Sequence, residues 1–363
     1  MSHPRILLLS TAAGIPLLGP SGASAHLRGI ARALQAVGDV TVAVPRLHDH
    51  RGAVDDALDL PVVTAPPRRW GVVPRRWRER GEVWDARRLV ARAVAAHGVP
   101  DLVWERHGLF SDAGLRLAAR HGVPRVVELN APLTLERARF EDLRDAVLAE
   151  VLEKASLRGA DRVVAVSDWL AGWAVAAAGC APERVVHVPN GVEDRGPGDR
   201  SATRARLGLT GLVVGFLGTL KPWHGVERLP GILRALPDAT ALVVGDGPVP
   251  VPDHPRIVAV GRVAPPALPD HLAAMDVGLA PYATDTPPWF CPLKVLEYSA
   301  AGLPVVAGDA GDCRTLLAGS AGEVLGTDDP FAWADAIRRQ AQAPRTPRLR
   351  TWHDVVAEAL HDL

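Results

Sequence analysis

Residues 292–307 read Pro-Leu-Lys-Val-Leu-Glu-Tyr-Ser-Ala-Ala-Gly-Leu-Pro-Val-Val-Ala. The stretch predicts a helix followed by a buried strand, because Gly302 suits a helix C-cap and the residues after it are apolar and β-branched. Lys294 and Glu297 fall on adjacent turns of this helix. A glutamate there can accept hydrogen bonds from both hydroxyls of a ribose, and N–H groups at the helix start, Cys291–Leu293, can bind a phosphate. The alternative is a surface ion pair between Lys294 and Glu297.

The same alternation of helix and strand runs along the whole chain. Short apolar runs predict strands covered by helices on both faces, as in parallel sheets. In the first half the candidate strands are Arg5–Ser10, Val40–Val44, Leu102–Glu105, Arg125–Leu129, Arg162–Val166 and Val185–Val188. In the second half they are Leu212–Leu217, Thr240–Val244, Arg256–Val260, Val277–Ala280 and Pro304–Ala307. The candidate helices in the first half are Ala23–Ala36, Asp85–His97, Asp112–His121, Leu135–Leu157 and Asp168–Ala178.

A Gly- and Pro-rich stretch, Asp194–Asp199, separates the two series and reads as a linker. We therefore expect an α/β protein with two doubly wound parallel-sheet domains. The first domain covers residues 1–193 and the second 194–350. A last helix, 351–363, can pack on either domain, including back on the first.

Composition excludes several classes of protein. The 363 residues contain 41 Lys and Arg against 41 Asp and Glu, so no charge excess points to nucleic acid. Cys180, Cys291 and Cys313 are too few and too far apart for a disulfide framework or a zinc site, and they favour a reducing cytoplasm. The apolar N-terminus resembles a signal peptide, but a strand, loop, helix and second strand explain it better. No apolar run approaches the ~20 residues that span a bilayer.

Three glycine-rich stretches follow predicted strands. Gly19–His26, which contains Gly22, would let a ligand approach a helix N-terminus, although a tight turn with a helix cap explains it equally well. Gly215–Gly225 combines Gly218 and Thr219 with Lys221 and His224, and backbone N–H groups beside a cation are what a diphosphate needs. Val243–Pro248, with Gly245, is by itself only a turn.

Taken together, these motifs resemble a known family. The second-half motifs, in this order and spacing, are similar to the nucleotide-binding domain of retaining family-4 glycosyltransferases with the GT-B fold (bacterial glycosyl transferases group 1). First-half segments that also look like this family are Gly14–Pro16, Gly22–His26, Trp104–Gly108, Val127–Pro132, Ala165–Asp168 and Pro189–Val192. The resemblance covers roughly residues 5–330. It implies two Rossmann-like domains facing across a cleft.

The resemblance also implies an activity and a set of site residues. The expected enzyme transfers a hexose-type sugar, with retention, from a UDP- or GDP-sugar to an acceptor, without a metal or another cofactor. The implied catalytic residues are Lys221, His224 and His107. The donor would be bound by Gly22, Gly218, Thr219, Gly245, Arg262, Val263, Cys291, Pro292, Leu293, Lys294 and Glu297. The acceptor would be bound by Glu105, Arg106, Glu128 and Asn130.

Two features leave alternatives open. The first glutamate of the family's paired motif falls at Trp289, and His224 stands where a second lysine is frequent. A sugar-nucleotide epimerase with the same fold, or a catalytically weak nucleotide-sugar-binding subunit, therefore stays in view. Arg68–Arg80 mixes arginines with Trp70 and Trp77, which suits contact with an anionic membrane or acceptor, or a solvated loop.

Overall fold

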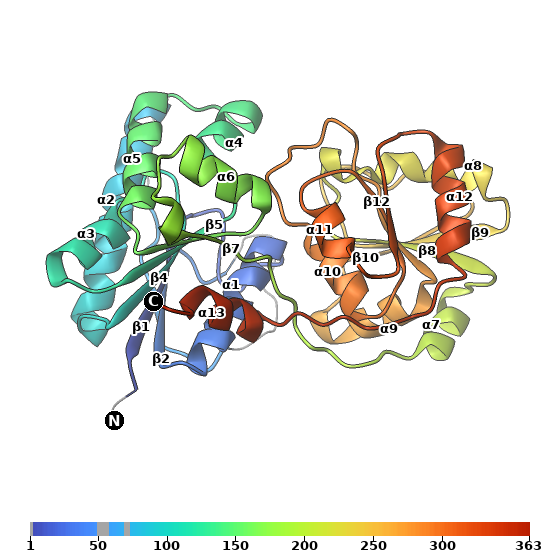
Figure 1. The fold of residues 1–363 in the computed structure, drawn as a ribbon, viewed down its shortest axis with the longest axis horizontal. Coiled ribbons are helices and arrows are strands. Elements are labelled where there is room, and N and C mark those ends of the chain that lie inside the picture. Colours follow the sequence, from blue (N-terminus) through green and yellow to red (C-terminus); the bar gives the residue numbers. More distant parts are fainter. Residues whose placement is uncertain (1–2, 49–57, 69–72) are drawn as a thin grey trace. The chain divides into compact units, whose positions relative to one another are not determined.

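The computed structural model describes residues 3–48, 58–68 and 73–363. It divides into two units, Met1–Asn190 with Trp352–Leu363, and Gly191–Thr351 (Figure 1). Within the described residues, no helix combines the length and the apolar character that crossing a bilayer requires.

The first unit is built on a parallel sheet with helices on both faces. Its seven strands lie in the order β3-β2-β1-β4-β5-β6-β7. They are β1 (Arg5–Ser10), β2 (Asp39–Val44), β3 (Val62–Thr64), β4 (Leu102–Arg106), β5 (Arg125–Leu129), β6 (Arg162–Ala165) and β7 (Val185–His187). The helices are α1 (Gly22–Gln35), α2 (Arg75–His97), α3 (Ala113–His121), α4 (Leu133–Phe140), α5 (Ala146–Arg158), α6 (Asp168–Ala176) and α13 (Trp352–Leu360).

The C-terminal helix α13 packs beside α1 in this unit (Figure 1). The contact depends on Gly29, where a Cβ atom would lie 2.2 Å from Nε1 of Trp352. The Trp352 ring also lies 4.6 Å, between centroids, from the ring of His26 on α1. A glycine on one helix thus makes room for a tryptophan of the other.

The second unit repeats the plan with six parallel strands in the order β10-β9-β8-β11-β12-β13. They are β8 (Leu212–Leu217), β9 (Ala239–Val244), β10 (Ile257–Gly261), β11 (Val277–Ala280), β12 (Val305–Gly308) and β13 (Gly322–Leu325). Helices α8 (Leu229–Ala235) and α12 (Pro330–Gln340) cover one face, and α9 (Leu268–Ala274), α10 (Leu293–Ala300) and α11 (Cys313–Leu317) cover the other. Helix α7 (Arg200–Leu207) packs against α9.

The predicted fold class is confirmed, with two parallel α/β sheets. The sequence did not predict the short strands β3 and β13. Helix α2 begins at Arg75 rather than Asp85, and the single helix expected over Leu135–Leu157 is broken into α4 and α5. Four residues of the basic stretch Arg68–Arg80, including Trp70, lie outside the described residues.

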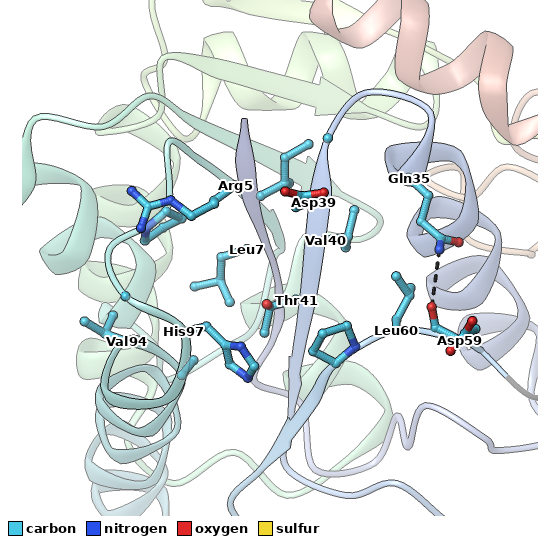
Figure 2. Close-up of a pocket in the computed structure, with 16 residues that line it drawn as sticks. Arg5, Leu7, Gln35, Asp39, Val40, Thr41, Asp59, Leu60, Val94 and His97 are labelled. Atoms are coloured by element: carbon cyan, nitrogen blue, oxygen red, sulfur yellow. Dashed lines mark hydrogen bonds between the residues drawn. The ribbon is translucent and has the colours of Figure 1, made fainter. Parts of the chain in front are cut away.

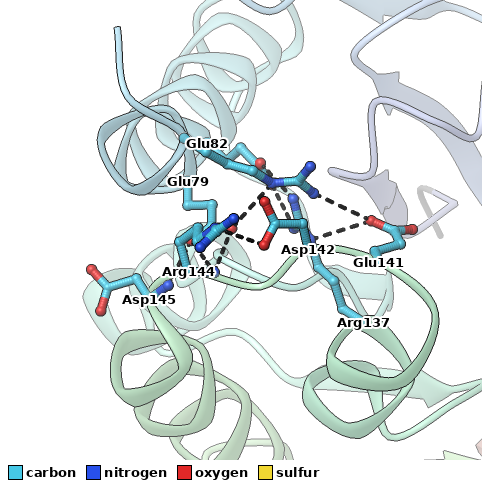
Figure 3. A network of polar contacts seen from close by, with 8 residues as sticks. Glu79, Glu82, Arg137, Glu141, Asp142, Arg144 and Asp145 are labelled. Atoms are coloured by element: carbon cyan, nitrogen blue, oxygen red, sulfur yellow. Dashed lines mark hydrogen bonds and ion pairs between the residues drawn. The ribbon is translucent and has the colours of Figure 1, made fainter.

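A buried carboxylate of α2 explains the break between α4 and α5. Glu79 is fully buried and accepts hydrogen bonds from the backbone N–H of Arg144 (3.1 Å) and of Asp145 (2.7 Å) (Figure 3). Asp145 in turn accepts from Arg80 Nε at 2.8 Å. The first turns of α2 are therefore held by polar contacts to this loop, which a search for apolar periodicity does not detect.

Candidate functional site

Two glycine turns meet at the carboxyl edge of the second sheet. Gly218, after β8, has φ +123°, and Gly245, after β9, has φ +134°. A Cβ atom on Gly245 would lie 2.0 Å from the carbonyl oxygen of Gly218, so a larger residue cannot replace it without moving the loop. The turns are joined by hydrogen bonds from Gly218 N to Val244 O (2.9 Å) and from Leu220 N to Asp246 O (3.0 Å). The edge is thus a surface of closely packed backbone.

Tyr298 fixes α10 against this edge. Its hydroxyl accepts a hydrogen bond from the backbone N–H of Leu217 (2.7 Å) and can donate to Gly215 O (3.2 Å) or Leu279 O (3.1 Å). The ring is fully buried against Gly278, where a Cβ atom would lie 2.5 Å away. This anchor sets the start of the helix, where Cys291 is buried and Pro292 is the N-cap, at the level of the β8 turn.

Lys294 is a buried cation beside that turn. The residue is 6% exposed, and a Cβ atom on Gly218 would lie 3.7 Å from Lys294 Cε. Its Nζ has no hydrogen-bond partner and lies 4.1 Å from the ring centroid of Phe216 and 5.1 Å from that of Tyr282. Burial lowers the pKa of Lys294 to about 7. Aromatic faces compensate a buried ammonium only in part, so an anion next to Gly218 would be bound strongly.

His224 is a neutral ring in this unit. Its Nδ1 contacts the carbonyl oxygen of Thr219, and because a carbonyl only accepts, Nδ1 carries the proton. Burial, together with Lys294 and Lys221, lowers the pKa of His224 to about 2. The ring therefore holds the loop through Thr219 and leaves a lone pair on Nε2. The cation of this loop is Lys221, an exposed side chain whose Nζ lies 5.0 Å from the centroid of Trp223.

Glu297 lies one turn along α10 and faces an arginine that the sequence did not indicate. Arg195 Nη2 is 3.7 Å from Glu297 Oε1, and both side chains are about one-fifth exposed. Burial raises the pKa of Glu297, against the influence of Arg195. Arg195 belongs to the predicted linker, where no pattern distinguishes a ligand-binding arginine from a solvated one.

Of the remaining predicted donor residues, Gly245, Arg262 and Val263 lie at the β9 turn, whereas Gly22 lies in the first unit. Gly245 donates its N–H to Gly261 O (2.7 Å), so the loop with Arg262 and the half-buried Val263 lies beside it. Arg262 donates three hydrogen bonds to Asp246, the shortest at 2.8 Å, and stays exposed. Gly22, in the first unit, is the first residue of α1, and the N-cap Ser21 already accepts from Ser24 N at 3.1 Å.

The predicted acceptor residues lie on two sides of the first sheet. Glu105 is buried on the α3 side, where it accepts from Arg125 Nε at 2.7 Å and where a Cβ atom on Gly114 would lie 1.9 Å from its Oε2. It is part of the core ion pair with Arg125 and is not grouped with Arg106, Glu128 and Asn130. His107 is near Glu153 of α5, at 3.4 Å between Nε2 and Oε1.

Arg106 and Glu128 share the α1 side with a histidine that sequence reasoning left unassigned. Glu128 accepts from Trp104 Nε1 (2.9 Å) and contacts His26 Nε2. Burial alone would raise the pKa of Glu128, but His26, Arg106 and Trp104 outweigh it and lower the pKa. Burial lowers the pKa of His26, although its contact with Glu128 opposes this shift. His26 is the last residue of the Gly19–His26 motif, and only the fold reveals its partner.

A pocket of about 530 Å³ lies at the opposite edge of the first sheet (Figure 2). It is lined by residues at the starts of β1 and β2, such as Arg5 and Asp39, and by His97 at the end of α2. None of the predicted site residues lines it. Among the described residues, no group of three histidine, cysteine or acidic side chains is placed to hold a metal ion.

Comparisons with known proteins match both units. The family described as "Glycosyltransferase Family 4" matches residues 20–195, and "Glycosyl transferases group 1" matches residues 211–342. D-inositol 3-phosphate glycosyltransferase 1 of Catenulispora acidiphila is 30% identical over 83% of this chain and 77% of its own length. D-inositol 3-phosphate glycosyltransferase of Acidothermus cellulolyticus is also 30% identical, over 69% of this chain and 62% of its own length, so the chain spans less than two thirds of that relative.

Solved structures with similar folds include two sugar-related proteins. Sucrose-phosphate synthase from Thermosynechococcus elongatus superimposes with a TM-score of 0.74, at 19% identity, over 99% of this chain and 94% of that one. Anabaena HepE, solved in complex with UDP and glucose, gives 0.68 at 22% identity, over 98% and 95%. Since family descriptions match both units and a relative is 30% identical over most of both chains, the protein belongs to the group 1, family-4 glycosyltransferases and is a sugar-nucleotide-dependent glycosyltransferase with the GT-B fold.

Proposed function

We propose that this enzyme transfers a hexose-type sugar from a nucleoside-diphosphate sugar to an acceptor with retention at the anomeric carbon. The observation that carries the donor side is the buried, unpartnered ammonium of Lys294 next to the Gly218 turn. The diphosphate would lie against this turn and the start of α10, with Lys221 at its exposed side. Glu297 would exchange Arg195 for the ribose hydroxyls. The HepE structure with bound UDP and glucose supports a uridine nucleotide, and a guanosine nucleotide is the second candidate.

The reaction exchanges one C–O bond for another at the sugar. The bond between C1 and the diphosphate oxygen breaks, and the acceptor oxygen bonds to C1 from the same face. The acceptor proton passes to the leaving diphosphate. Lys221 and the N–H groups of the Gly218 turn stabilise the charge that develops on the leaving group. Neutral His224 keeps Thr219 in place, so its contribution is to the shape of the loop.

Nucleotide-dependent stabilisation tests the proposal. Purified protein is heated with UDP, GDP, ADP or TDP, and we expect one uridine or guanosine nucleotide to raise Tm by several degrees. Lys221→Ala should lower the rate of donor hydrolysis and of transfer at least tenfold, because one cation on the leaving group is removed. The matched control is Lys154→Ala. Lys154 is another of the chain's three lysines and forms an exposed pair with Glu150 on α5. Failure of every nucleotide diphosphate to stabilise the protein would refute the proposal.

Product analysis separates the remaining possibilities. Retention predicts that NMR of the product shows the anomeric configuration of the donor, and turnover unchanged by EDTA would support a metal-independent reaction. An epimerised nucleotide sugar formed without an acceptor would favour the epimerase. Stabilisation by nucleotide without donor hydrolysis or transfer would favour the weak binding subunit, which the tryptophan at position 289 motivates. All three cysteines are buried and none of them forms a disulfide, in keeping with a cytoplasmic reaction.

We also propose that α2 contacts an anionic membrane surface. Trp77 and Trp84 are 56% and 61% exposed and lie seven residues apart, on one face of the helix. Arg80 and Arg87 lie against their rings, at 5.1 and 5.6 Å. Sedimentation with phosphatidylglycerol vesicles should show salt-sensitive binding that Trp77→Ser with Trp84→Ser abolishes. Equal recovery with neutral phosphatidylcholine vesicles, or no binding, would contradict this.

A further inference from the structure

Few of the described lysine and arginine side chains are buried, and their partners differ. In the described part of the chain, the buried lysine and arginine side chains are Arg28, Arg106, Arg125 and Lys294. Arg28 donates to the carbonyl oxygens of Leu17 (2.8 Å) and Gly19 (2.9 Å), and Arg125 is paired with Glu105. Lys294 belongs to the donor site. Arg106 is the one whose burial the fold and the donor site leave unexplained.

Arg106 is buried without the contacts that normally compensate a guanidinium. It is 8% exposed, its Nη1 has no hydrogen-bond partner, and no ion pair joins it to a carboxylate of the described residues. Burying a charge without a direct partner is energetically costly. Such a cost is typical of a group that is held ready for a ligand.

The neighbouring strands present further unused polar atoms at the same edge. Arg106 is the last residue of β4 and pairs in register with Ser10, the last residue of β1, and with Glu128 of β5. Ser10 Oγ, Thr11 Oγ1 and Asn130 Nδ2 are buried and have no hydrogen-bond partner. A Cβ atom on Gly108 would lie 2.3 Å from Thr11 Oγ1, which places that hydroxyl beside the loop that follows β4. Three adjacent strands thus end in unsatisfied groups.

The chemistry of these groups favours an anion. Two carboxylates, Glu128 and Glu136, act on the charge of Arg106. Glu128 has one oxygen engaged by Trp104 Nε1 and the other by His26 Nε2. Of the unused atoms, Arg106 Nη1 and Asn130 Nδ2 can only donate, and the two hydroxyls can donate. A neutral polyol brings hydroxyls that accept but also donate, whereas an ionised phosphate or carboxylate brings acceptor oxygens and a negative charge to this group of donors.

We propose that Arg106, with Ser10, Thr11 and Asn130, forms an oxyanion subsite, so that the acceptor of the transferase carries a phosphate monoester or a carboxylate. The acceptor's role rests on the proposed function, but the subsite itself does not. Arg106 fixes the anionic group, and the hydroxyl that attacks the sugar belongs to another part of the same small molecule.

The test measures anion binding with the donor site already filled. The protein is saturated with the nucleotide that stabilises it most, and Tm is followed against inorganic phosphate or acetate at constant ionic strength. We expect a saturable rise with at least one of the two anions, beyond that of sodium chloride. Phosphate alone would identify a phosphate monoester, and acetate alone a carboxylate. If neither phosphate nor acetate gives a saturable rise in Tm, the proposal is overturned.

Variants assign the effect to Arg106. Arg106→Gln should weaken anion binding at least tenfold, while the nucleotide affinity changes less than twofold. Arg106→Lys should lose an intermediate part of the anion affinity. Arg116→Gln, at an exposed arginine of α3, should leave the anion affinity unchanged. An unchanged anion affinity in Arg106→Gln would overturn the assignment. If Arg106→Gln does not fold, the same conclusion follows from unchanged anion affinities in both Asn130→Ala and Arg106→Lys. If no nucleotide raises the Tm of the wild-type protein, the proposed function is refuted instead.

Discussion

Replacing Lys294 by methionine should stabilise the protein and weaken donor binding at the same time. The two side chains have similar length and volume, but methionine carries no charge into the pocket between Phe216 and Tyr282. The ordinary pKa of lysine is 10.5, and burial lowers that of Lys294 to about 7. A difference of about 3.5 pH units, at 1.36 kcal/mol per unit, corresponds to about 5 kcal/mol of destabilisation as an upper bound.

The sign of the pH dependence follows from the two pKa values. Below pH 7 both the folded and the unfolded chain hold the Lys294 proton, so the full penalty of the buried charge is present. Between pH 7 and 10.5 the unfolded chain binds more protons, and stability therefore rises with pH. Lys294→Met removes this contribution. The variant should have a higher Tm than the wild type at pH 6, by several degrees, and the difference should shrink toward pH 10.

Calorimetry of UDP binding gives an independent readout. At pH 8 a group with a pKa of about 7 is about 90% deprotonated, and an adjacent diphosphate would restore its charge, so binding should take up about 0.9 proton. Titrations at pH 8 in buffers that differ in heat of ionisation measure this uptake, and at pH 6 it should fall to about 0.1 proton. Lys294→Met should bind UDP at least tenfold more weakly, without uptake at pH 8. A destabilised variant with unchanged UDP affinity would refute the reasoning.

The remaining predictions concern close packing. Gly245→Ala should weaken nucleotide binding and destabilise the fold by about 1–3 kcal/mol, since φ +134° and the Gly218 carbonyl both oppose a Cβ. Gly231→Ala in α8, whose added Cβ meets atoms no closer than 3.7 Å, is the control and should be neutral or up to about 1 kcal/mol stabilising in urea unfolding. Tyr298→Phe should cost about 1–3 kcal/mol in the same assay, because the Leu217 N–H loses its acceptor, and a loss below about 0.5 kcal/mol would contradict the anchor. Gly29→Ala should displace Trp352, and protease sensitivity of the C-terminal segment should rise; an unchanged cleavage pattern would argue against docking of α13 on α1.

The sheets were predictable because their strands are apolar on both faces. Arg5–Ser10 and Leu212–Leu217 have the predicted bounds. The strands β3 and β13 were missed because each is short and lies at the edge of its sheet, where pairing on one side suffices and the apolar run is brief. The predicted helix began ten residues too late, at Asp85, because the first turns of α2 are not apolar. Glu79 and the arginines of these turns are instead stabilised by polar contacts to the loop before α5.

Site residues were harder to predict than strands, because side-chain direction alternates along a strand. Glu105 and Arg106 are neighbours in the sequence and were predicted to act together, yet they lie on opposite faces of β4. Glu105 forms an ion pair with Arg125, which lies twenty residues further along the chain. Which of two adjacent polar residues reaches a ligand depends on the partners across the sheet, and a single sequence does not show these.

Two of the buried cations, Lys294 and Arg106, place different demands on the fold. A buried lysine can relieve its cost by losing the proton, and Lys294 does so near neutral pH. An arginine cannot lose its proton in this range, so Arg106 stays charged whether or not a ligand is bound. Its burial is tolerable because Glu128, held ionised by His26 and Trp104, lies nearby without direct contact. Glu128 therefore supplies a background negative charge that lowers the cost of Arg106 while leaving its Nη1 unused. On this argument His26 and Trp104 maintain a binding arginine that neither of them touches.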